Sequence, residues 1–113
     1  MVVDQRLSDA EVDRLFFALA DATRRDIVRR TLVEEFSVSA LARQYPMSIT
    51  AVQKHVAVLE EAGLVSRRKE GREQRVSGRP EGIERARQLL DAYEEIWRGR
   101  VDRMGALLEE DPG

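Results

Sequence analysis

Apolar residues recur three and four positions apart between Met47 and Val65, and this spacing predicts an amphipathic helix. Its apolar stripe consists of Ile49, Val52, Val56 and Leu59. Ser48 is placed to cap the first turn and Gly63 to close the last one. Lys54 lies opposite the stripe among small side chains, so the outer face is slim and polar. Such a face suits entry into the major groove of DNA, although an ordinary surface helix has the same pattern.

The segments on both sides of this helix predict a helix-turn-helix followed by a wing. Upstream, residues 36–46 favour a short helix that is capped by Ser39 and stops at Tyr45–Pro46. A short helix, a tight turn and a capped second helix form a helix-turn-helix. Downstream, residues 64–77 favour two short strands joined at Gly71, which can supply a positive φ. A ribbon directly after such a helix is a wing.

Two further amphipathic helices are expected before this unit. Ser8 and Glu11 have the spacing of a capping box at the start of the first one, after an arm of residues 1–7. Asp21 is placed to cap the second helix, which runs to about Leu32. Four arginines are expected on its outer face, solvated or paired with nearby acids: Arg24, Arg25, Arg29 and Arg30.

A long helix is predicted from Pro80 to near the C-terminus, because an apolar stripe persists at helical spacing. Some 26 residues at about 1.5 Å each would span roughly 39 Å, more than a domain of this size can cover with its own core. The surplus favours a second copy of the chain, anchored by Tyr93, Ile96 and Trp97. The alternative is a helix folded across its own body, with Trp97 in the core. Two glycines inside the predicted helix would permit close helix approach at the interface, or would mark a kink or an early end of the helix: Gly99 and Gly105.

Composition narrows the class of protein. The 113 residues include no cysteine, which excludes disulfides and thiolate metal sites. No apolar run approaches the roughly 18 residues of a membrane helix, and the N-terminus lacks the layout of a secretory signal. We therefore expect a single cytoplasmic domain, mainly α-helical with a small two-stranded β-wing. Its parts would be residues 8–35 (N-terminal helices), 37–63 (helix-turn-helix), 64–77 (wing) and 80–109 (long C-terminal helix).

Charge is distributed unevenly along the chain. The formal net charge is −2, but residues 37–79 hold eight of the 19 basic residues and four of the 21 acidic ones, which is a net charge of +4. The rest of the chain has 11 basic and 17 acidic residues, a net charge of −6. A basic middle between acidic ends favours a polyanionic partner, and a solvated charged hairpin is the alternative.

Several stretches of the chain resemble the ArsR-type (ArsR/SmtB-like) family of bacterial winged-helix repressors. FFALADATRRDIV, residues 16–28, resembles the signature that joins the first two helices of that family. Residues 39–68 resemble its helix-turn-helix running into the wing, and residues 70–76 its wing tip and return strand. The resemblance covers roughly residues 10–100, while the longer MarR-like regulators fit less well. It implies a homodimer, formed largely by the first and last helices, that binds an inverted-repeat operator and represses transcription.

The resemblance also assigns residues to each surface. The positions that contact bases in the family fall on Ser48, Thr50, Ala51, Gln53, Lys54 and His55. The phosphate contacts of its wing fall on Arg67, Arg68, Lys69, Arg72 and Arg75. The dimer interface would use Val12, Leu15, Phe16, Leu19, Tyr93, Ile96, Trp97, Val101 and Met104. Gln53 stands where the family usually has serine, and a glutamine can make a bidentate contact to adenine, so the operator preference is expected to differ.

The chain departs from the family in its sensing residues as well. Many relatives hold a metal through cysteines on the short helix or through Asp and His pairs on the last helix. Here residues 37–44 contain no cysteine and the last helix contains no histidine. The last helix could gather a hard cation only through exposed acids, which are usually solvated: Asp91, Glu94 and Glu95. We expect a regulator without the family's metal sites and without a cofactor, and the sequence does not identify an effector.

The sequence leaves two classes of function open besides DNA binding. In the first, the winged helix is a protein-interaction module whose basic hairpin docks an acidic partner protein. The slim outer face lacks the aromatic anchors that such a site favours. In the second, the chain is an enzyme, but no nucleophile and base are paired, no glycine-rich phosphate loop occurs, and His55 has no partner to orient it. The sequence therefore predicts a DNA-binding regulator that has no catalytic residue.

Overall fold

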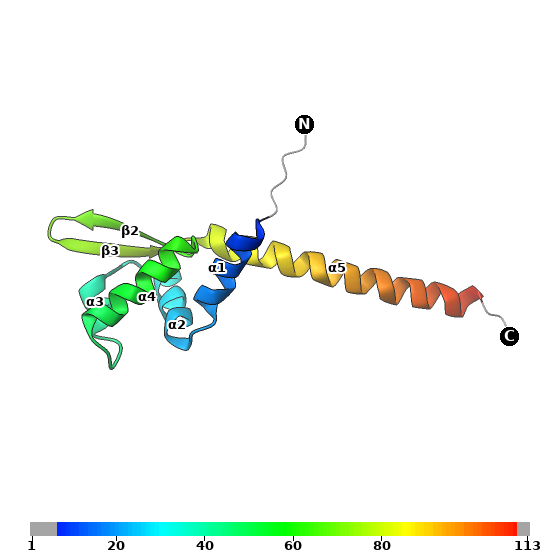
Figure 1. The fold of residues 1–113 in the computed structure, drawn as a ribbon, viewed down its shortest axis with the longest axis horizontal. Coiled ribbons are helices and arrows are strands. Elements are labelled where there is room, and N and C mark those ends of the chain that lie inside the picture. Colours follow the sequence, from blue (N-terminus) through cyan, green and yellow to red (C-terminus); the bar gives the residue numbers. More distant parts are fainter. Residues whose placement is uncertain (1–6, 111–113) are drawn as a thin grey trace, which may run out of the picture.

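Five helices and a three-stranded sheet make up residues 7–110, the part of the chain that the computed structural model describes. The expected N-terminal arm lies outside this part except for Leu7. Helices α1 to α4 and the sheet gather at one end of the molecule, and α5 extends from them as a rod (Figure 1). The elements are α1 (Asp9–Leu19), α2 (Ala22–Val33), β1 (Phe36–Ser37), α3 (Val38–Ala42), α4 (Ile49–Glu61), β2 (Val65–Glu70), β3 (Glu73–Gly78) and α5 (Pro80–Glu110).

Side-chain caps fix where the helices begin. Ser8 and Glu11 form the expected capping box, since the Ser8 hydroxyl accepts from the Glu11 amide at 3.1 Å and the Ser8 amide donates to the Glu11 carboxylate at 3.3 Å. The Asp21 carboxylate accepts from the Arg24 amide at 3.0 Å. The Ser48 hydroxyl accepts from the Ala51 amide at 3.1 Å. The caps that the sequence predicts for α1, α2 and α4 are therefore confirmed.

The short helix α3 begins earlier than the sequence suggested. Its cap is Ser37, whose hydroxyl accepts from the Ala40 amide at 3.1 Å, so the prediction of Ser39 as the cap was wrong. Ser37 is the end of β1, which pairs with β3 through Phe36↔Val76 and Ser37↔Arg75. The chain therefore passes from a strand into a helix at a single residue, and the backbone of Ser37 is fixed by the sheet before the helix begins.

The wing is a β-hairpin completed by this third strand. The strand order is β1-β3-β2, and both pairs are antiparallel. The hairpin turn holds Gly71 at φ 63°, as expected for a tight turn with glycine in its first central position. Strand β1 has two residues, and it ties the base of the wing to the segment between α2 and α3.

Helix α4 ends as the sequence predicts. Gly63 has φ 76°, and its amide donates to the carbonyl of Glu60 at 3.0 Å. The Leu64 amide donates to the carbonyl of Leu59 at 3.0 Å. This pair of bonds is the Schellman closure, which satisfies two carbonyls of the last turn. It also turns the chain directly from α4 into β2, so only Ala62, Gly63 and Leu64 separate this helix from the wing.

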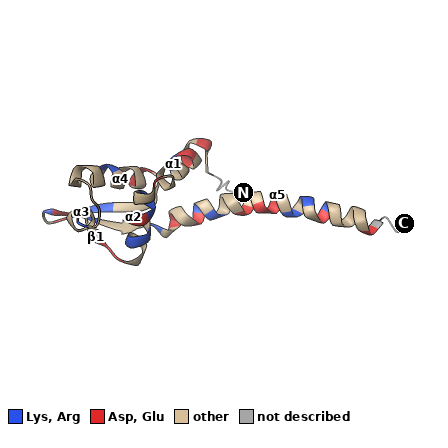
Figure 2. Cartoon of the chain, turned by 90° about the horizontal axis from the view of Figure 1, so that it is seen from below, with Lys and Arg blue, Asp and Glu red and all other residues tan. Residues whose placement is uncertain are grey.

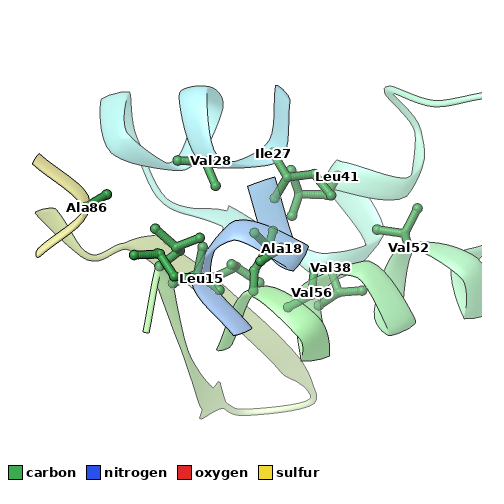
Figure 3. Packing of buried hydrophobic residues seen from close by; sticks show 13 residues of the cluster. Leu15, Ala18, Ile27, Val28, Val38, Leu41, Val52, Val56 and Ala86 are labelled. Carbon is green, nitrogen blue, oxygen red and sulfur yellow. The ribbon is translucent and has the colours of Figure 1, made fainter. Parts of the chain in front are cut away.

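The hydrophobic core lies between α1, α2, α3, α4 and the sheet (Figure 3). The stripe of α4 enters it through Val52, Val56 and Leu59, which are fully buried. Ile49 does not follow them, because the first turn of α4 lies at the edge of the core, and its side chain is 45% exposed. Leu15 is 2% exposed and packs in the core of its own chain, so its expected place in a dimer interface was wrong.

Helix α5 leaves the body after its first turns. Ala86 is buried, but the apolar side chains beyond Leu89 are exposed. Trp97 is 58% exposed, so the alternative in which this helix folds across its own body with Trp97 in the core was wrong. The helix has 31 residues, about 46 Å at the usual rise, and runs without interruption through Gly99 and Gly105.

Candidate nucleic-acid interface

The expected DNA-contacting elements lie together at the end of the molecule opposite the tip of α5. The first turns of α4, helix α3 and the turn of the wing all lie at this end (Figure 1). A groove of about 280 Å³ runs between them. It is lined by Ser37, Val38, Ser39, Ile49, Gln53, Arg72, Glu73 and Gln74. The structure therefore brings Gln53 of the recognition helix and Arg72 of the wing, which are distant in sequence, to one surface.

The outer face of α4 is polar and open. Thr50, Gln53 and Lys54 are exposed, and Ala51 is half-buried. Lys54 forms no ion pair with any described residue, so its ammonium group is available to a partner. The Ser48 hydroxyl is occupied as an acceptor by its capping bond, and its proton is still free to be donated. Four of the six expected base-contacting residues thus present polar groups outward from one helix.

His55 lies differently from its neighbours on α4. Its ring is half-buried, and Nδ1 is 3.3 Å from Nη1 of Arg24. A guanidinium has only donors, so Nδ1 must accept and the ring proton is on Nε2. One side of His55 therefore packs against α2 rather than facing outward. Sequence reasoning missed this contact because Arg24 was expected on the outer face of α2.

Arg24 is in fact 9% exposed and links three helices. Its Nε donates to the carbonyl of Ala18 at 2.9 Å and its Nη2 to the carbonyl of Phe17 at 2.8 Å, which satisfies the C-terminal turn of α1. The guanidinium also lies over the Phe17 ring, 4.9 Å from its centroid. With the contact to His55, this arginine connects the end of α1 to the recognition helix.

A second polar cluster holds the turn between α3 and α4. Tyr45 donates to the Asp26 carboxylate at 2.7 Å, and Arg30 donates to the same carboxylate at 2.8 Å. These bonds, with another from Arg29, hold the pKa of Asp26 far below its usual range. Burial, and then the bond to Asp26, raise the pKa of Tyr45 to about 12. The turn that positions α4 is therefore fastened to α2.

The basic residues of the wing differ in what they touch. Arg67 points toward α4, and its guanidinium pairs with Glu60 at 2.8 Å. Arg68 and Arg75 both pair with Glu35, at 2.8 and 3.3 Å, and have second contacts with Glu70 and Glu73. Lys69 and Arg72 are exposed and pair with no described residue. Among residues 7–110, therefore, two of the five expected phosphate contacts, Lys69 and Arg72, have no ion-pair partner in this conformation.

The described residues hold no group of three or more histidine, cysteine, aspartate or glutamate side chains that could bind a metal. On α5, acids and arginines are interspersed (Figure 2). Asp91 pairs with Arg87 at 3.1 Å, and Glu94 pairs with Arg98. The acids that could have gathered a hard cation are thus largely neutralised by their neighbours. Within residues 7–110, no helix is long and apolar enough to cross a membrane.

The residues expected at a dimer interface fall into two groups. Tyr93, Ile96, Trp97, Val101 and Met104 form an exposed stripe along α5. On α1, Phe16 is exposed and Val12 and Leu19 are half-buried, while Leu15 belongs to the core. Val12 also lines a cavity of about 360 Å³ between α1 and α5, together with Leu89 and Tyr93. The apolar surface is therefore continuous from α1 to α5.

Comparisons with known proteins agree with this arrangement. Residues 19–68 match a family described as a helix-turn-helix domain. The HTH-type transcriptional regulator Rv2034 of Mycobacterium tuberculosis is 41% identical over 81 residues, which cover 72% of this chain and 76% of that protein. An ArsR-like transcriptional regulator from Rhodococcus sp. RHA1 superposes with a TM-score of 0.80 at 31% identity, covering 89% of this chain and 93% of that one.

The homodimeric winged helix-turn-helix DNA-binding domain of Mb0332 from Mycobacterium bovis superposes with a TM-score of 0.62 at 27% identity, covering 84% and 91% of the two chains. The likeness in sequence and in structure spans most of the chain. The chain belongs to the ArsR-type family of winged helix-turn-helix transcriptional regulators, which bind DNA and are not enzymes.

Proposed function

We propose that the chain is a homodimeric repressor that binds an inverted-repeat operator without the metal sensing of its relatives. Two surfaces at opposite ends of one molecule support this proposal. The groove between α4 and the wing tip presents polar groups, whereas α5 presents an apolar stripe that residues 7–110 leave exposed. A second copy is the partner that fits the stripe, because a two-fold interface pairs identical surfaces. The homodimeric relative Mb0332 supports the same assembly.

In this proposal α4 enters the major groove and supplies the sequence preference. Gln53 can make a bidentate contact to adenine, and Lys54 can contact guanine. Thr50 is exposed on the same face, and Ala51 leaves room for the bases. His55 keeps its Nε2 proton as a donor, since its Nδ1 is engaged by Arg24. The two α4 helices of a dimer would lie about 34 Å apart, one helical turn of the duplex.

The wing supplies sequence-independent affinity in the same proposal. Arg72 at the turn and Lys69 beside it are free to contact phosphate or to reach into the minor groove. A dimer seated across two half-sites covers the duplex, and this excludes RNA polymerase from an overlapping promoter. The single observation that carries the proposal is the position of Gln53 and Arg72 on one open groove.

Selection of bound duplexes from a random pool by the purified protein tests the proposal, followed by binding measurements on variants. The selected sites should show two half-sites with two-fold symmetry, one helical turn apart. Gln53→Ala should change the preferred base at one position of each half-site and cost about 1–3 kcal/mol on the best site. Arg72→Ala should weaken binding to every sequence and reduce the salt slope by about one.

Arg103→Ala is the matched control, because it removes the same charge from the distal part of α5. It should leave both sequence preference and salt slope unchanged. If Gln53→Ala and Arg72→Ala behave like this control, the assignment of the DNA-contacting surface is wrong. Asymmetric selected sites, or a purified protein that is monomeric when bound to them, would contradict the inverted-repeat operator.

A further inference from the structure

The side chains of the wing are divided between its two faces. Successive residues of a strand point to opposite sides, so Arg67 and Lys69 share the face of β2 that packs toward α4. Arg68 is on the other face, opposite Arg75 in the register of the hairpin. The Ser66 and Ser77 hydroxyls, 3.0 Å apart, mark the same face one step nearer the body. We call this surface, made by Ser66, Arg68, Glu70, Glu73, Arg75 and Ser77, the outer wing face.

Two arginines directly opposite each other on one face of a hairpin repel each other. Glu35, from the segment between α2 and β1, removes this repulsion by contacting both. Its carboxylate accepts from Nη1 of Arg68 at 2.8 Å and from Nε of Arg75 at 3.3 Å. Because of these bonds, that to Arg68 first, the pKa of Glu35 is lowered, and the carboxylate is charged at neutral pH.

The outer wing face is therefore not basic, although its sequence is rich in arginine. Glu70 and Glu73 lie beside Arg68 and Arg75, at 3.0 and 3.5 Å. With Glu35, three carboxylates face two guanidinium groups. Glu35 is the one of the three that touches both arginines. The Arg68 side chain is 56% exposed, so a DNA phosphate could reach it if the carboxylate were absent.

We propose that Glu35 occupies the two arginines in place of DNA phosphate and so limits the affinity of the protein for non-specific DNA. This inference rests on the proposed DNA-binding function. Non-specific binding is supplied by cations that displace counterions from phosphates, and it grows with each free cation. Within the described part of the chain, the wing residues without an ion-pair partner are Lys69 and Arg72, and such a wing attracts any duplex weakly. The contacts of α4 with bases then account for more of the discrimination between sequences.

The inference predicts a gain of function from the loss of one carboxylate. Glu35→Gln should bind a random-sequence duplex several-fold more tightly than the wild type, with a salt slope steeper by about one. Glu34→Gln is the matched control. Glu34 is the neighbouring residue, is exposed and pairs with no described residue, so its substitution changes the net charge equally and frees no arginine.

The measurement is fluorescence anisotropy of a labelled random-sequence duplex with the full chain, between about 50 and 200 mM salt. A Glu35→Gln variant that matches Glu34→Gln in affinity and slope would overturn the inference. So would weaker binding by Glu35→Gln, since the carboxylate would then align the wing and not compete with phosphate. Thermal unfolding by circular dichroism shows whether the variants fold like the wild type.

A second substitution tests which arginines are involved. In the wild type, Arg68→Gln should leave the salt slope for random DNA unchanged, because Arg68 is already occupied. In the Glu35→Gln background the same change should remove most of the added slope. An equal effect of Arg68→Gln in both backgrounds would overturn the inference. If the wild type binds no duplex at low salt, the proposed function itself fails, which is a different outcome.

Discussion

Helices α4 and α5 share one amphipathic pattern and lie in opposite environments. In α4, Val52, Val56 and Leu59 are fully buried by the rest of the chain. In α5, Ile96 is 69% exposed, and the apolar side chains that follow it toward the C-terminus are exposed as well. The other described helices and strands gather at the opposite end of the molecule (Figure 1). Helical periodicity predicts which side of a helix is apolar, but what covers that side depends on the topology of the remaining elements.

The buried stripe of α4 and the exposed stripe of α5 also have different roles. The buried stripe of α4 fixes that helix to the body, and this leaves its polar side at the surface in a defined orientation. The stripe of α5 is exposed among the described residues of one chain and is therefore available to a second chain. Substitutions of apolar stripe residues should therefore have different consequences in the two helices. In α4 they should affect folding, and in α5 they should affect assembly.

The largest effect is expected from a charge on the stripe of α5. Ile96→Glu should dissociate the proposed dimer, because a carboxylate would have to be buried at an apolar interface. Without the second half-site contact, affinity for an inverted repeat should fall by about 100-fold or more. Light scattering after size-exclusion chromatography measures the assembly, and anisotropy measures the DNA binding.

Arg98→Glu is the control for this change, since it places a glutamate two residues away on the opposite side of α5. It should keep both the dimer and the DNA affinity. Circular dichroism should show the same helical content for both variants. A dimer that persists with Ile96→Glu would mean that the stripe is not the interface.

The same kind of test on α4 should affect folding instead. Leu59→Ala removes a fully buried side chain and leaves a cavity, so the free energy of unfolding should fall by about 2–5 kcal/mol. Urea denaturation measures the free energy of unfolding, and its decrease in Leu59→Ala should be present at every protein concentration that is tested. Thr50→Ala, on the exposed side of the same helix, should change stability by well under 1 kcal/mol. Equal effects of the two substitutions would contradict the burial of the stripe.

The smallest effect is expected where the turn before α4 is fastened to α2. Tyr45→Phe removes the bond to Asp26 and should lower the free energy of unfolding by about 1–2 kcal/mol at neutral pH. The pKa of Tyr45 in the folded protein, about 12, is above its ordinary value near 10. The wild type therefore has this stabilisation below about pH 10 and loses it as the pH rises toward 12.

Asp26 determines how the free energy of unfolding changes at acid pH. Its pKa is lowered by Tyr45, Arg30 and Arg29, so its contribution is present above about pH 4 and is lost as the pH falls further. Tyr45→Phe should reduce the loss of folding stability both at acid pH, where Asp26 is protonated, and at alkaline pH, where Tyr45 is deprotonated. Denaturation at several pH values tests this. If the variant loses stability at alkaline pH as the wild type does, the pKa of Tyr45 is not raised in the folded protein.

Much of the fold follows from local chemistry that is visible in the sequence. The caps Ser8, Asp21 and Ser48 satisfy amides within three residues, and Gly63 and Gly71 meet local demands for a positive φ. Contacts between distant segments were the ones that sequence reasoning missed. Strand β1 is too short to show a period, and only its pairing with β3 defines it.

The same limit applies to the candidate site. The sequence places Arg24 at a helical position that looks exposed, and nothing local shows that the end of α1 and His55 lie within its reach. Glu35 carries no motif, and its role depends on Arg68 and Arg75, which are adjacent only in the folded hairpin. A residue's charge was predictable, but which charges neutralise one another was not.

The open stripe of α5 has a consequence for how such a regulator responds to its own abundance. If two chains must meet before either holds an operator firmly, then well below the dissociation constant of the pair the active species grows with the square of the total amount. Halving the supply of chains would cut that species by about fourfold. Dilution at cell division or turnover by proteases would then sharply relieve the proposed repression, with no small molecule needed as a signal.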